Sequence, residues 1–358
     1  MKLVIFGLSV SSSWGNGHAT LWRGLIRALA RSGHNVVFYE RDVPYYAQHR
    51  DLPRLSEGEL RLYRSWDEVW RQASADLDSA DVGMVTSYCP DGCAAADLIL
   101  SSATAVKLFY DLDTPVTLVR LRNGEPVPYI PEAGLAGFDL VLSYTGGTAL
   151  AELRQRLGAR RVAPLYGSVD PAIHFPVPPS DHHRADLSYL GTYAQDRQEA
   201  LVRLFVEPAR RLPTRRFLIG GAQYPAGFPW SDNIYFVRHL PPSEHPAFYC
   251  SSRLTLNVTR SPMAEMGYCP SGRLFEAAAC AAPVLTDSWD GLRDFFEPGF
   301  EILMAQSGED VTAALELSDQ DLRRIGQAAR ERVLAEHTAD RRASQLVSAI
   351  ESALPVEA

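Results

Sequence analysis

The segment from Ser271 to Glu276 combines residue types that suit an anionic ligand. It follows Pro270 and leads into an apolar run, which predicts a helix that begins near Gly272. The free N–H groups and the dipole at the start of a helix favour an anion, and a glycine lets the anion approach the backbone. Arg273 adds a planar guanidinium that binds phosphate oxygens in pairs. We expect a diphosphate here, with Glu276 accepting hydrogen bonds from ribose hydroxyls. The alternative is an ordinary capped helix with a solvated Arg273–Glu276 pair.

A second candidate site lies where a strand is predicted to end. Gly191, Thr192 and Tyr193 close the apolar run at 187–191, and open parallel sheets bind ligands beyond the carboxyl ends of their strands. A glycine there lets a phosphate approach the backbone, and Arg197 is close enough in sequence to assist. The alternative is an ordinary strand-to-helix turn.

His18 is the candidate catalytic base. It follows a loop of Gly15, Asn16 and Gly17, which comes off the first predicted strand. A neutral imidazole in this place can take a proton from an acceptor hydroxyl. Asp111 and Asp113 come directly after the predicted strand at 106–110, which suits a partner for that imidazole. The alternative is a histidine that only caps the following helix.

The elements that position these residues read as two α/β domains. A strand at 3–10, a helix at 20–31 and a strand at 35–39 open the first domain. Short apolar runs at 84–88, 106–110, 116–119, 140–144 and 161–166 predict its other strands. A proline-rich linker at 167–184 follows. We then expect strands at 187–191, 216–219, 234–237 and 254–258, and a helix at 196–211.

The domain boundaries follow from this pattern. We predict an N-terminal domain at 1–167 and a C-terminal domain at 168–337. A final helix at 338–358 has an apolar face, and packing against the N-terminal domain is one option for it.

The composition narrows the class of protein. The chain has 358 residues, 46% of them hydrophobic and 22% charged, which is typical of a globular protein of about two domains. A net charge of −8 argues against nucleic acid as a partner. The five cysteines are an odd number without metal-ligand spacing, so we expect a cytoplasmic protein without a metal site. No run approaches the ~20 apolar residues of a transmembrane segment. The oligomeric state stays open.

The sequence also resembles a known family. The pattern R-x-F-E-A-A-A-C-x-x-P from Arg273, followed by T-D, G-L and F-E-P-G-x-E, resembles the C-terminal domain of GT-B glycosyltransferases, specifically the CgeB-like group. The segment from Leu190 to Tyr193 is similar too. In the first domain, the resemblance rests on the segments at 13–18, 111–115 and 143–147. It therefore spans most of the chain.

The resemblance implies an α/β fold with two Rossmann-like domains (GT-B architecture) that face each other across a cleft. It makes 1–167 the acceptor-side domain and 168–337 the nucleotide-sugar-binding domain. It implies a metal-independent glycosyltransferase without a cofactor, which moves a hexosyl or related group from a nucleoside-diphosphate sugar to an unidentified small-molecule acceptor. Some inverting members use a histidine oriented by an aspartate, as His18 and Asp113 or Asp111 are placed to do.

The resemblance also assigns places to individual residues. Glu276 stands at the ribose, Arg273 and the Ser271–Gly272 backbone stand near the diphosphate, and His239 and Leu240 stand where backbone groups hold the base. The remaining matched positions are Asp290 and Gly291 in the donor domain and Gly146 and Gly147 in a cleft loop. Many retaining relatives have a glutamate eight residues before the ribose glutamate. This chain has Tyr268 there, so the stereochemical outcome stays open.

Three other functions compete with transfer. A nicotinamide-dependent enzyme is disfavoured, because Gly7, Gly15 and Gly17 do not form G-x-G-x-x-G after the first strand. A nucleotide-sugar epimerase or hydrolase would share the same fold. A non-catalytic sugar- or nucleotide-binding protein is the third option.

Overall fold

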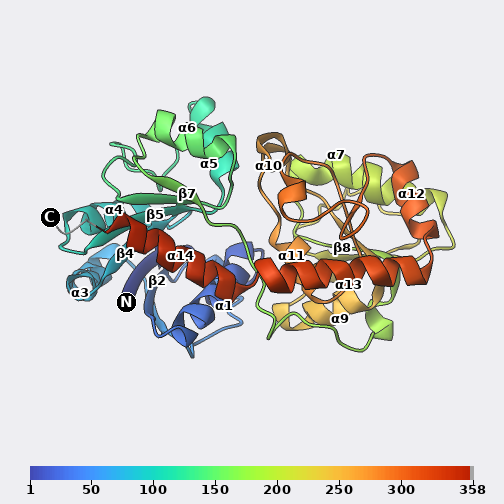
Figure 1. The fold of residues 1–358 in the computed structure, drawn as a ribbon, viewed down its shortest axis with the longest axis horizontal. Coiled ribbons are helices and arrows are strands. Elements are labelled where there is room, and N and C mark those ends of the chain that lie inside the picture. Colours follow the sequence, from blue (N-terminus) through green and yellow to red (C-terminus); the bar gives the residue numbers. More distant parts are fainter. Residues whose placement is uncertain (355–358) are drawn as a thin grey trace. The chain divides into compact units, whose positions relative to one another are not determined.

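The computed structural model describes residues 1–354, which form two compact units. The first unit comprises residues 1–166 and the helix that begins at Ala339, and the second comprises residues 167–338. Figure 1 shows the two units, each with a central sheet between helices. We describe each unit by itself.

The first unit is built on a seven-stranded parallel sheet with the order β3-β2-β1-β4-β5-β6-β7. The strands are β1 (Lys2–Gly7), β2 (Asn35–Arg41), β3 (Glu59–Tyr63), β4 (Val82–Thr86), β5 (Val106–Asp111), β6 (Leu140–Ser143) and β7 (Val162–Pro164). The strand order reverses between β1 and β4, and loops beyond the carboxyl ends of strands at such a point form ligand sites. His18 follows β1, Asp111 is the last residue of β5, and Asp113 comes directly after β5.

Helices cover both faces of this sheet. They are α1 (Gly17–Arg31), α2 (Pro44–Ala47), α3 (Trp66–Asp78), α4 (Gly92–Ser101), α5 (Thr114–Arg122), α6 (Thr148–Leu157) and α14 (Ala339–Ala353). One core lies beneath α1 and α14, and the other lies beneath α3 and α4. The last helix, α14, therefore completes the core of the unit in which the chain begins. Figure 1 shows it in red alongside the blue α1.

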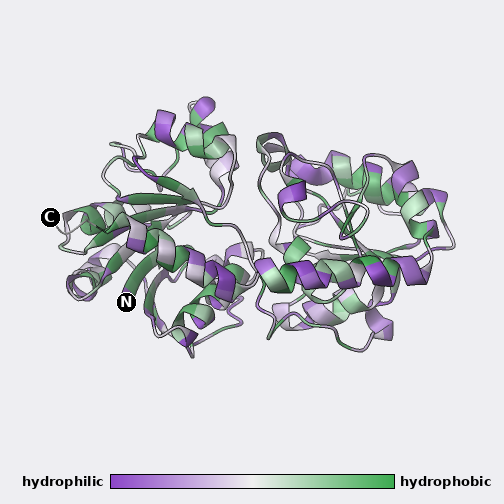
Figure 2. Ribbon diagram, viewed as in Figure 1, coloured by the Kyte–Doolittle hydropathy of each residue, from purple (hydrophilic) through white to green (hydrophobic). Residues whose placement is uncertain are grey.

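The second unit has a six-stranded parallel sheet with the order β10-β9-β8-β11-β12-β13. The strands are β8 (Ala185–Leu190), β9 (Phe217–Gly221), β10 (Ile234–Arg238), β11 (Ser252–Asn257), β12 (Val284–Thr286) and β13 (Leu303–Met304). The strand order reverses between β8 and β11. In Figure 2 the sheet strands are largely hydrophobic, which fits strands buried on both faces.

The helices of the second unit vary in length. They are α7 (Gln198–Leu201), α8 (Glu207–Arg211), α9 (His245–Cys250), α10 (Ser261–Met266), α11 (Gly272–Ala279), α12 (Gly308–Glu316) and α13 (Asp319–Glu336). Short 3-10 turns occur at Asp181–His183, Gln195–Arg197, Pro242–Glu244 and Leu292–Asp294.

Two predicted elements differ from the structure, and strand β3 was not predicted. Val116 to Val119 was expected to be a strand but lies in helix α5, because Pro115 in its first turn starts a helix readily. The helix expected at 196–211 is interrupted by a π turn at Val202–Val206, just before Pro208, which lacks the N–H of a regular turn. Strand β3 lies in a segment where no strand was predicted. No helix within residues 1–354 has the length and apolar character needed to cross a membrane.

Candidate functional site

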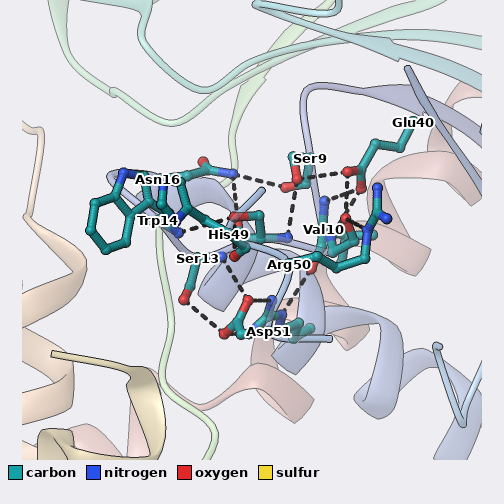
Figure 3. Close-up of polar contacts among 12 residues, drawn as sticks. Ser9, Val10, Ser13, Trp14, Asn16, Glu40, His49, Arg50 and Asp51 are labelled. Atoms are coloured by element: carbon teal, nitrogen blue, oxygen red, sulfur yellow. Dashed lines mark hydrogen bonds and ion pairs between the residues drawn. The ribbon is translucent and has the colours of Figure 1, made fainter. Parts of the chain in front are cut away.

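The loop after β1 is held by a buried carboxylate. Glu40 on β2 is fully buried and accepts four hydrogen bonds from this loop. The hydroxyls of Ser9 and Ser11 donate to Oε1 at 2.8 and 2.6 Å, and the N–H groups of Val10 and Ser11 donate to Oε2 at 2.8 and 2.9 Å. Figure 3 shows these contacts converging on Glu40. A buried charge with all its hydrogen bonds satisfied makes the loop rigid.

A second carboxylate fixes the outer part of the same loop. Asp51 accepts the N–H and hydroxyl of Ser13 at 2.9 and 2.8 Å. It also receives two bonds from the guanidinium of Arg23 on α1, at 2.9 and 2.7 Å. Burial acts to raise the pKa of Asp51, but the Arg23 and Ser13 contacts outweigh it and lower the pKa to about 2. The loop is therefore tied both to β2 and to α1.

Asn16 connects this loop to the helix that carries His18. It is the N-cap residue of α1, and its Oδ1 accepts the N–H of His18 at 3.1 Å. Its amide nitrogen donates to the carbonyls of Ser9 and Ser12 at 3.0 and 3.1 Å. Figure 3 shows Asn16 at the end of the network that begins at Glu40.

The remaining loop residues shape its exposed side. Gly15 has φ = 60°, which a glycine adopts without strain, and Gly17 is the first residue of α1. Trp14 stacks on His49 with ring centroids 4.0 Å apart and an interplanar angle of 15°.

The structure brings His18 and Asp113 together. His18 Nε2 lies 2.7 Å from Asp113 Oδ2, so the neutral imidazole carries its proton on Nε2 and has its lone pair on Nδ1. Nδ1 is buried and has no hydrogen-bond partner. This is the tautomer that a histidine base needs when an aspartate orients it.

Asp111 is placed differently from Asp113. It is fully buried, and its Oδ1 accepts the N–H of Asp113 at 3.0 Å, while its Oδ2 has no partner. Burial raises the pKa of Asp111 to about 6. Asp111 therefore supports the turn that carries Asp113, and no hydrogen bond joins it to His18 within the described residues.

The glycines at 146 and 147 follow β6, next to β5. Gly147 precedes α6 with φ = 56°, a value that favours glycine at this turn.

In the second unit, α11 starts as the sequence analysis expects. Gly272 is its first residue, and the preceding Ser271 makes no capping hydrogen bond through its side chain. The guanidinium of Arg273 lies 5.8 Å from the ring centroid of Tyr189, and its Nε is buried without a partner. The start of α11 therefore presents free N–H groups and a cation together.

Gly191 and Arg197 lie beside this helix start. A Cβ atom at Gly191 would come within 2.7 Å of Arg273 NH1, so only glycine fits without displacing the arginine. Arg197 donates to Tyr189 Oη and to the carbonyl of Thr192, both at 3.3 Å, and its Nε is also buried without a partner. Both arginines therefore lie close to the Tyr189 side chain at the end of β8. Positive charge in this place suits a diphosphate.

Tyr193, the last residue of that turn, packs against an aromatic cluster. Its ring lies 5.7 Å from that of Tyr224, and its hydroxyl contacts the side chain of Gln198. Its contacts are thus mainly those of a packing residue.

Glu276 is buried on α11, and its Oε2 faces three side chains. The Tyr249 hydroxyl lies at 3.4 Å, His245 Nδ1 at 3.4 Å and His174 Nε2 at 3.9 Å. Burial acts to raise the pKa of Glu276, but His174, His245 and Arg273 outweigh it and lower the pKa to about 2. All these contacts use Oε2, which leaves Oε1 available to a ligand.

His174 and His245 were not identified from the sequence. His174 lies in the proline-rich linker, and His245 begins a short helix 71 residues later. No spacing connects either histidine with Glu276, and a fold is needed to bring them together. The proline and glycine pattern signalled only that the linker was irregular.

Tyr268 contacts Asp290 and Gly291, which belong to another segment of the chain. Tyr268 has φ = 47°, and its N–H donates to the Asp290 carbonyl at 2.6 Å. A Cβ at Gly291 would lie 2.5 Å from the Tyr268 ring, so this glycine makes room for the ring. His239 also has a positive φ, 51°, and its N–H donates to Gly221 at 2.7 Å, while the Leu240 carbonyl faces His245 Nε2 at 3.3 Å.

These two sheets, with sites at the carboxyl ends of their strands, define the class of fold. The protein has the two Rossmann-like domains of the GT-B glycosyltransferases. Residues 197–348 match a family model described as glycosyl transferase-like. The match includes Arg197, His239, Arg273 and Glu276. Membership of the CgeB-like group is not part of this match.

Solved structures agree with this fold over nearly the whole chain. Sucrose-phosphate synthase from Thermosynechococcus elongatus aligns with a TM-score of 0.71 and 15% identity, covering 98% of each chain. HepE from Anabaena, in complex with UDP-glucose, aligns with a TM-score of 0.67 and 11% identity, covering 98% of this chain and 100% of that one. An alpha-glucosyltransferase in complex with UDP aligns with a TM-score of 0.70 and 11% identity, with the same coverage. No curated protein matches this sequence.

Proposed function

We propose that the protein is a metal-independent glycosyltransferase that moves a hexosyl or related group from a nucleoside-diphosphate sugar to a small acceptor. One group of four residues carries the proposal. Gly191 and Arg197 follow the carboxyl end of β8, and Arg273 and Glu276 lie in the first turns of α11. The group combines two cations and free helix N–H groups with a buried carboxylate at the distance of one helical turn. A diphosphate next to a ribose has the matching charges and hydroxyls.

The family match over residues 197–348 supports this assignment. So do the HepE structure, which is a complex with UDP-glucose, and the alpha-glucosyltransferase structure, which is a complex with UDP. We propose a uridine nucleotide as the first donor to test. In this proposal, the backbone near His239 and Leu240 holds the base, and Tyr268, Asp290 and Gly291 lie near the sugar.

In the proposed mechanism, binding comes first. The diphosphate binds to Arg273, Arg197 and the N-terminus of α11, while Glu276 Oε1 accepts ribose hydroxyls. These donors are in place before the reaction, so they stabilise the diphosphate anion as it leaves the sugar. No metal is needed to neutralise the leaving group, because the two guanidiniums supply the positive charge.

His18 activates the acceptor in this mechanism. Its Nδ1 takes the hydroxyl proton of the acceptor as the oxygen attacks the anomeric carbon, and Asp113 stabilises the imidazolium that forms. The Glu40 and Asp51 contacts hold the loop that positions this base. The loop with Gly146 and Gly147 borders the same sheet edge and is proposed as part of the acceptor side.

The test is a panel of nucleoside diphosphates measured by thermal shift and calorimetry, followed by transfer and hydrolysis of the corresponding sugar donors. Binding of a diphosphate should raise the melting temperature with the logarithm of its concentration. Glu276→Gln should weaken binding at least tenfold, and Glu297→Gln on the exposed surface serves as the matched control. Normal diphosphate binding by Glu276→Gln would refute the ribose assignment.

The products separate the related functions. A transferase forms a glycosylated acceptor, and a hydrolase releases only free sugar. An epimerase converts one donor sugar into another, and a binding protein leaves the donor unchanged.

A further inference from the structure

His174 has an unusual environment for a buried histidine. Only 1% of the residue is exposed, yet neither Nδ1 nor Nε2 has a hydrogen-bond partner. A buried polar group without a partner lowers the stability of the folded protein. Its nearest charged atom is Glu276 Oε2, which lies 3.9 Å from Nε2. The ring is therefore directed at the carboxylate without bonding to it.

His245 provides a second ring nitrogen at the same carboxylate. Its Nε2 lies 3.3 Å from the Leu240 carbonyl, which accepts but cannot donate, so Nε2 carries the proton of the neutral ring. Nδ1 then has the lone pair, and it faces Glu276 Oε2 at 3.4 Å. Two acceptors face each other there in the neutral ring, which is unfavourable unless a proton or a metal ion lies between them. Metal-binding histidines commonly donate their second N–H to a backbone carbonyl in this way.

The three side chains converge on one point. One ligand atom from each of His174, His245 and Glu276 lies within 4.8 Å of the others. Bonds of about 2.0–2.2 Å to a tetrahedral zinc ion would place neighbouring ligand atoms about 3.3–3.6 Å apart. The 3.4 Å separation already has this value, and the 3.9 Å separation needs only a small contraction. A proton would join only one pair of these atoms, whereas a metal ion would contact all three.

We propose that His174, His245 and Glu276 bind a divalent transition-metal ion of the zinc type. Two histidines and one glutamate are a known zinc ligand set that leaves a fourth position open. If the proposed function is correct, an ion on Oε2 draws electron density from the carboxylate whose Oε1 accepts the ribose hydroxyls, so that metal and nucleotide weaken each other's binding. The metal then inhibits the proposed transfer reaction and takes no part in its chemistry.

The test starts from protein that has been freed of metal with a chelator. Zn²⁺ is titrated in competition with a chromophoric chelator, and we expect one ion per chain with a dissociation constant below about 1 μM. His174→Gln and His245→Gln should each weaken binding at least tenfold. His182→Gln removes an exposed histidine of the same linker and should bind as the unaltered protein does. Equal affinity in all four proteins, or no binding, would overturn the proposal.

Cobalt provides a readout that identifies the ligands. Co²⁺ bound by nitrogen and oxygen gives visible bands without the strong near-ultraviolet absorption of a thiolate complex. A thiolate spectrum would assign the ion to cysteines and overturn the site. Zn²⁺ should also raise the melting temperature of the unaltered protein and leave that of His245→Gln unchanged. His245 is less buried than His174, so this variant tests the site even where His174→Gln fails to fold.

Competition is measured with UDP, with and without one equivalent of Zn²⁺. Zn²⁺ should weaken UDP binding at least tenfold in the unaltered protein but not in His245→Gln, which controls for chelation of the ion by UDP itself. Equal UDP affinity with and without Zn²⁺ in the unaltered protein would refute this coupling. If Zn²⁺ binds and no nucleoside diphosphate does, the metal site stands and the proposed function fails. If a nucleoside diphosphate binds and Zn²⁺ does not, the proposed function stands and the metal site is refuted.

Discussion

The loop after β1 in the first unit and the region around the start of α11 in the second unit differ in the hydrogen bonding of their buried polar groups. In the first unit, Glu40 is buried with four hydrogen bonds from a single loop, so its charge is fully used inside the protein. In the second, His174, His245, Arg197 and Arg273 each have a buried ring or guanidinium nitrogen without a hydrogen-bond partner. Buried polar groups whose hydrogen bonds are all made stabilise the fold. Buried polar groups without hydrogen bonds, where they lie in a ligand site, are available to bind a ligand. The two kinds of group should respond differently to substitution.

The largest expected effect is on the scaffold. Glu40→Ala should lower the free energy of unfolding by about 4 kcal/mol, because two backbone N–H groups and two hydroxyls lose their buried acceptor. Urea unfolding measures this change. Glu57→Ala on the surface should change stability by less than about 0.5 kcal/mol. Similar values for both variants would contradict the role of Glu40 in holding the loop.

His18→Ala tests an imidazole with one hydrogen-bonded ring nitrogen, Nε2, and one buried nitrogen without a partner, Nδ1. We expect transfer to fall about 100- to 1,000-fold, the usual contribution of a general base, while donor affinity stays within about twofold. Transfer kinetics and calorimetry with UDP measure the two quantities. Asp113→Asn should also slow transfer, because the amide favours the wrong tautomer of the imidazole. Equal losses of binding and transfer would refute the assignment of His18 as the base.

Asp111 tests the comparison through pH, because its Oδ2 is a buried carboxylate oxygen of the first unit that has no hydrogen-bond partner. Burial raises its pKa to about 6, above its value in the unfolded chain. The stability that protonated Asp111 contributes is therefore complete below about pH 4 and lost as the pH rises through 6.

Asp111→Asn should remove this loss. The free energy of unfolding of the variant minus that of the unaltered protein is the quantity to compare. It should be on the order of 3 kcal/mol larger at pH 7.5 than at pH 4. Urea unfolding across this pH range measures the change. Two parallel stability curves would show that Asp111 does not titrate in this way.

The smallest expected effect concerns Arg273. Arg273→Gln should weaken UDP binding about 10- to 30-fold, or about 2 kcal/mol, with little change in the free energy of unfolding. Arg293→Gln, which removes an exposed arginine paired with Glu297, is the control for loss of charge. A large loss of stability with unchanged affinity would make Arg273 part of the scaffold.

Local patterns in the sequence predicted much of this arrangement. The helix start at Gly272 followed from a proline, a glycine and an apolar run, all of which act within one turn. The pairing of His18 with an aspartate followed from two strand ends in one parallel sheet. The sequence did not show whether Asp111 or Asp113 contacts His18. That depends on which carboxylate points into the core, and in the structure it is Asp111.

Other features depended on contacts that no local pattern encodes. The segment at 116–119 is apolar enough for a strand, but the proline before it made a helix start instead. His174 precedes β8, His245 precedes β11 and Glu276 follows β11, so only the tertiary fold brings them together and their sequence spacing carries no signal. Glu40 is similar, because a charged residue at the end of an apolar strand gives no sign of the loop that will cover it.

The return of α14 to the first unit affects the order in which the protein is completed during synthesis. Ala343, Leu346 and Ile350 fill the core beside α1, yet the ribosome makes them after the whole second unit. The second unit is one continuous stretch of chain and closes its own core as soon as it emerges. The N-terminal half must wait with one face of its sheet partly uncovered, so it is the part most exposed to chaperones and proteases while the chain is being made.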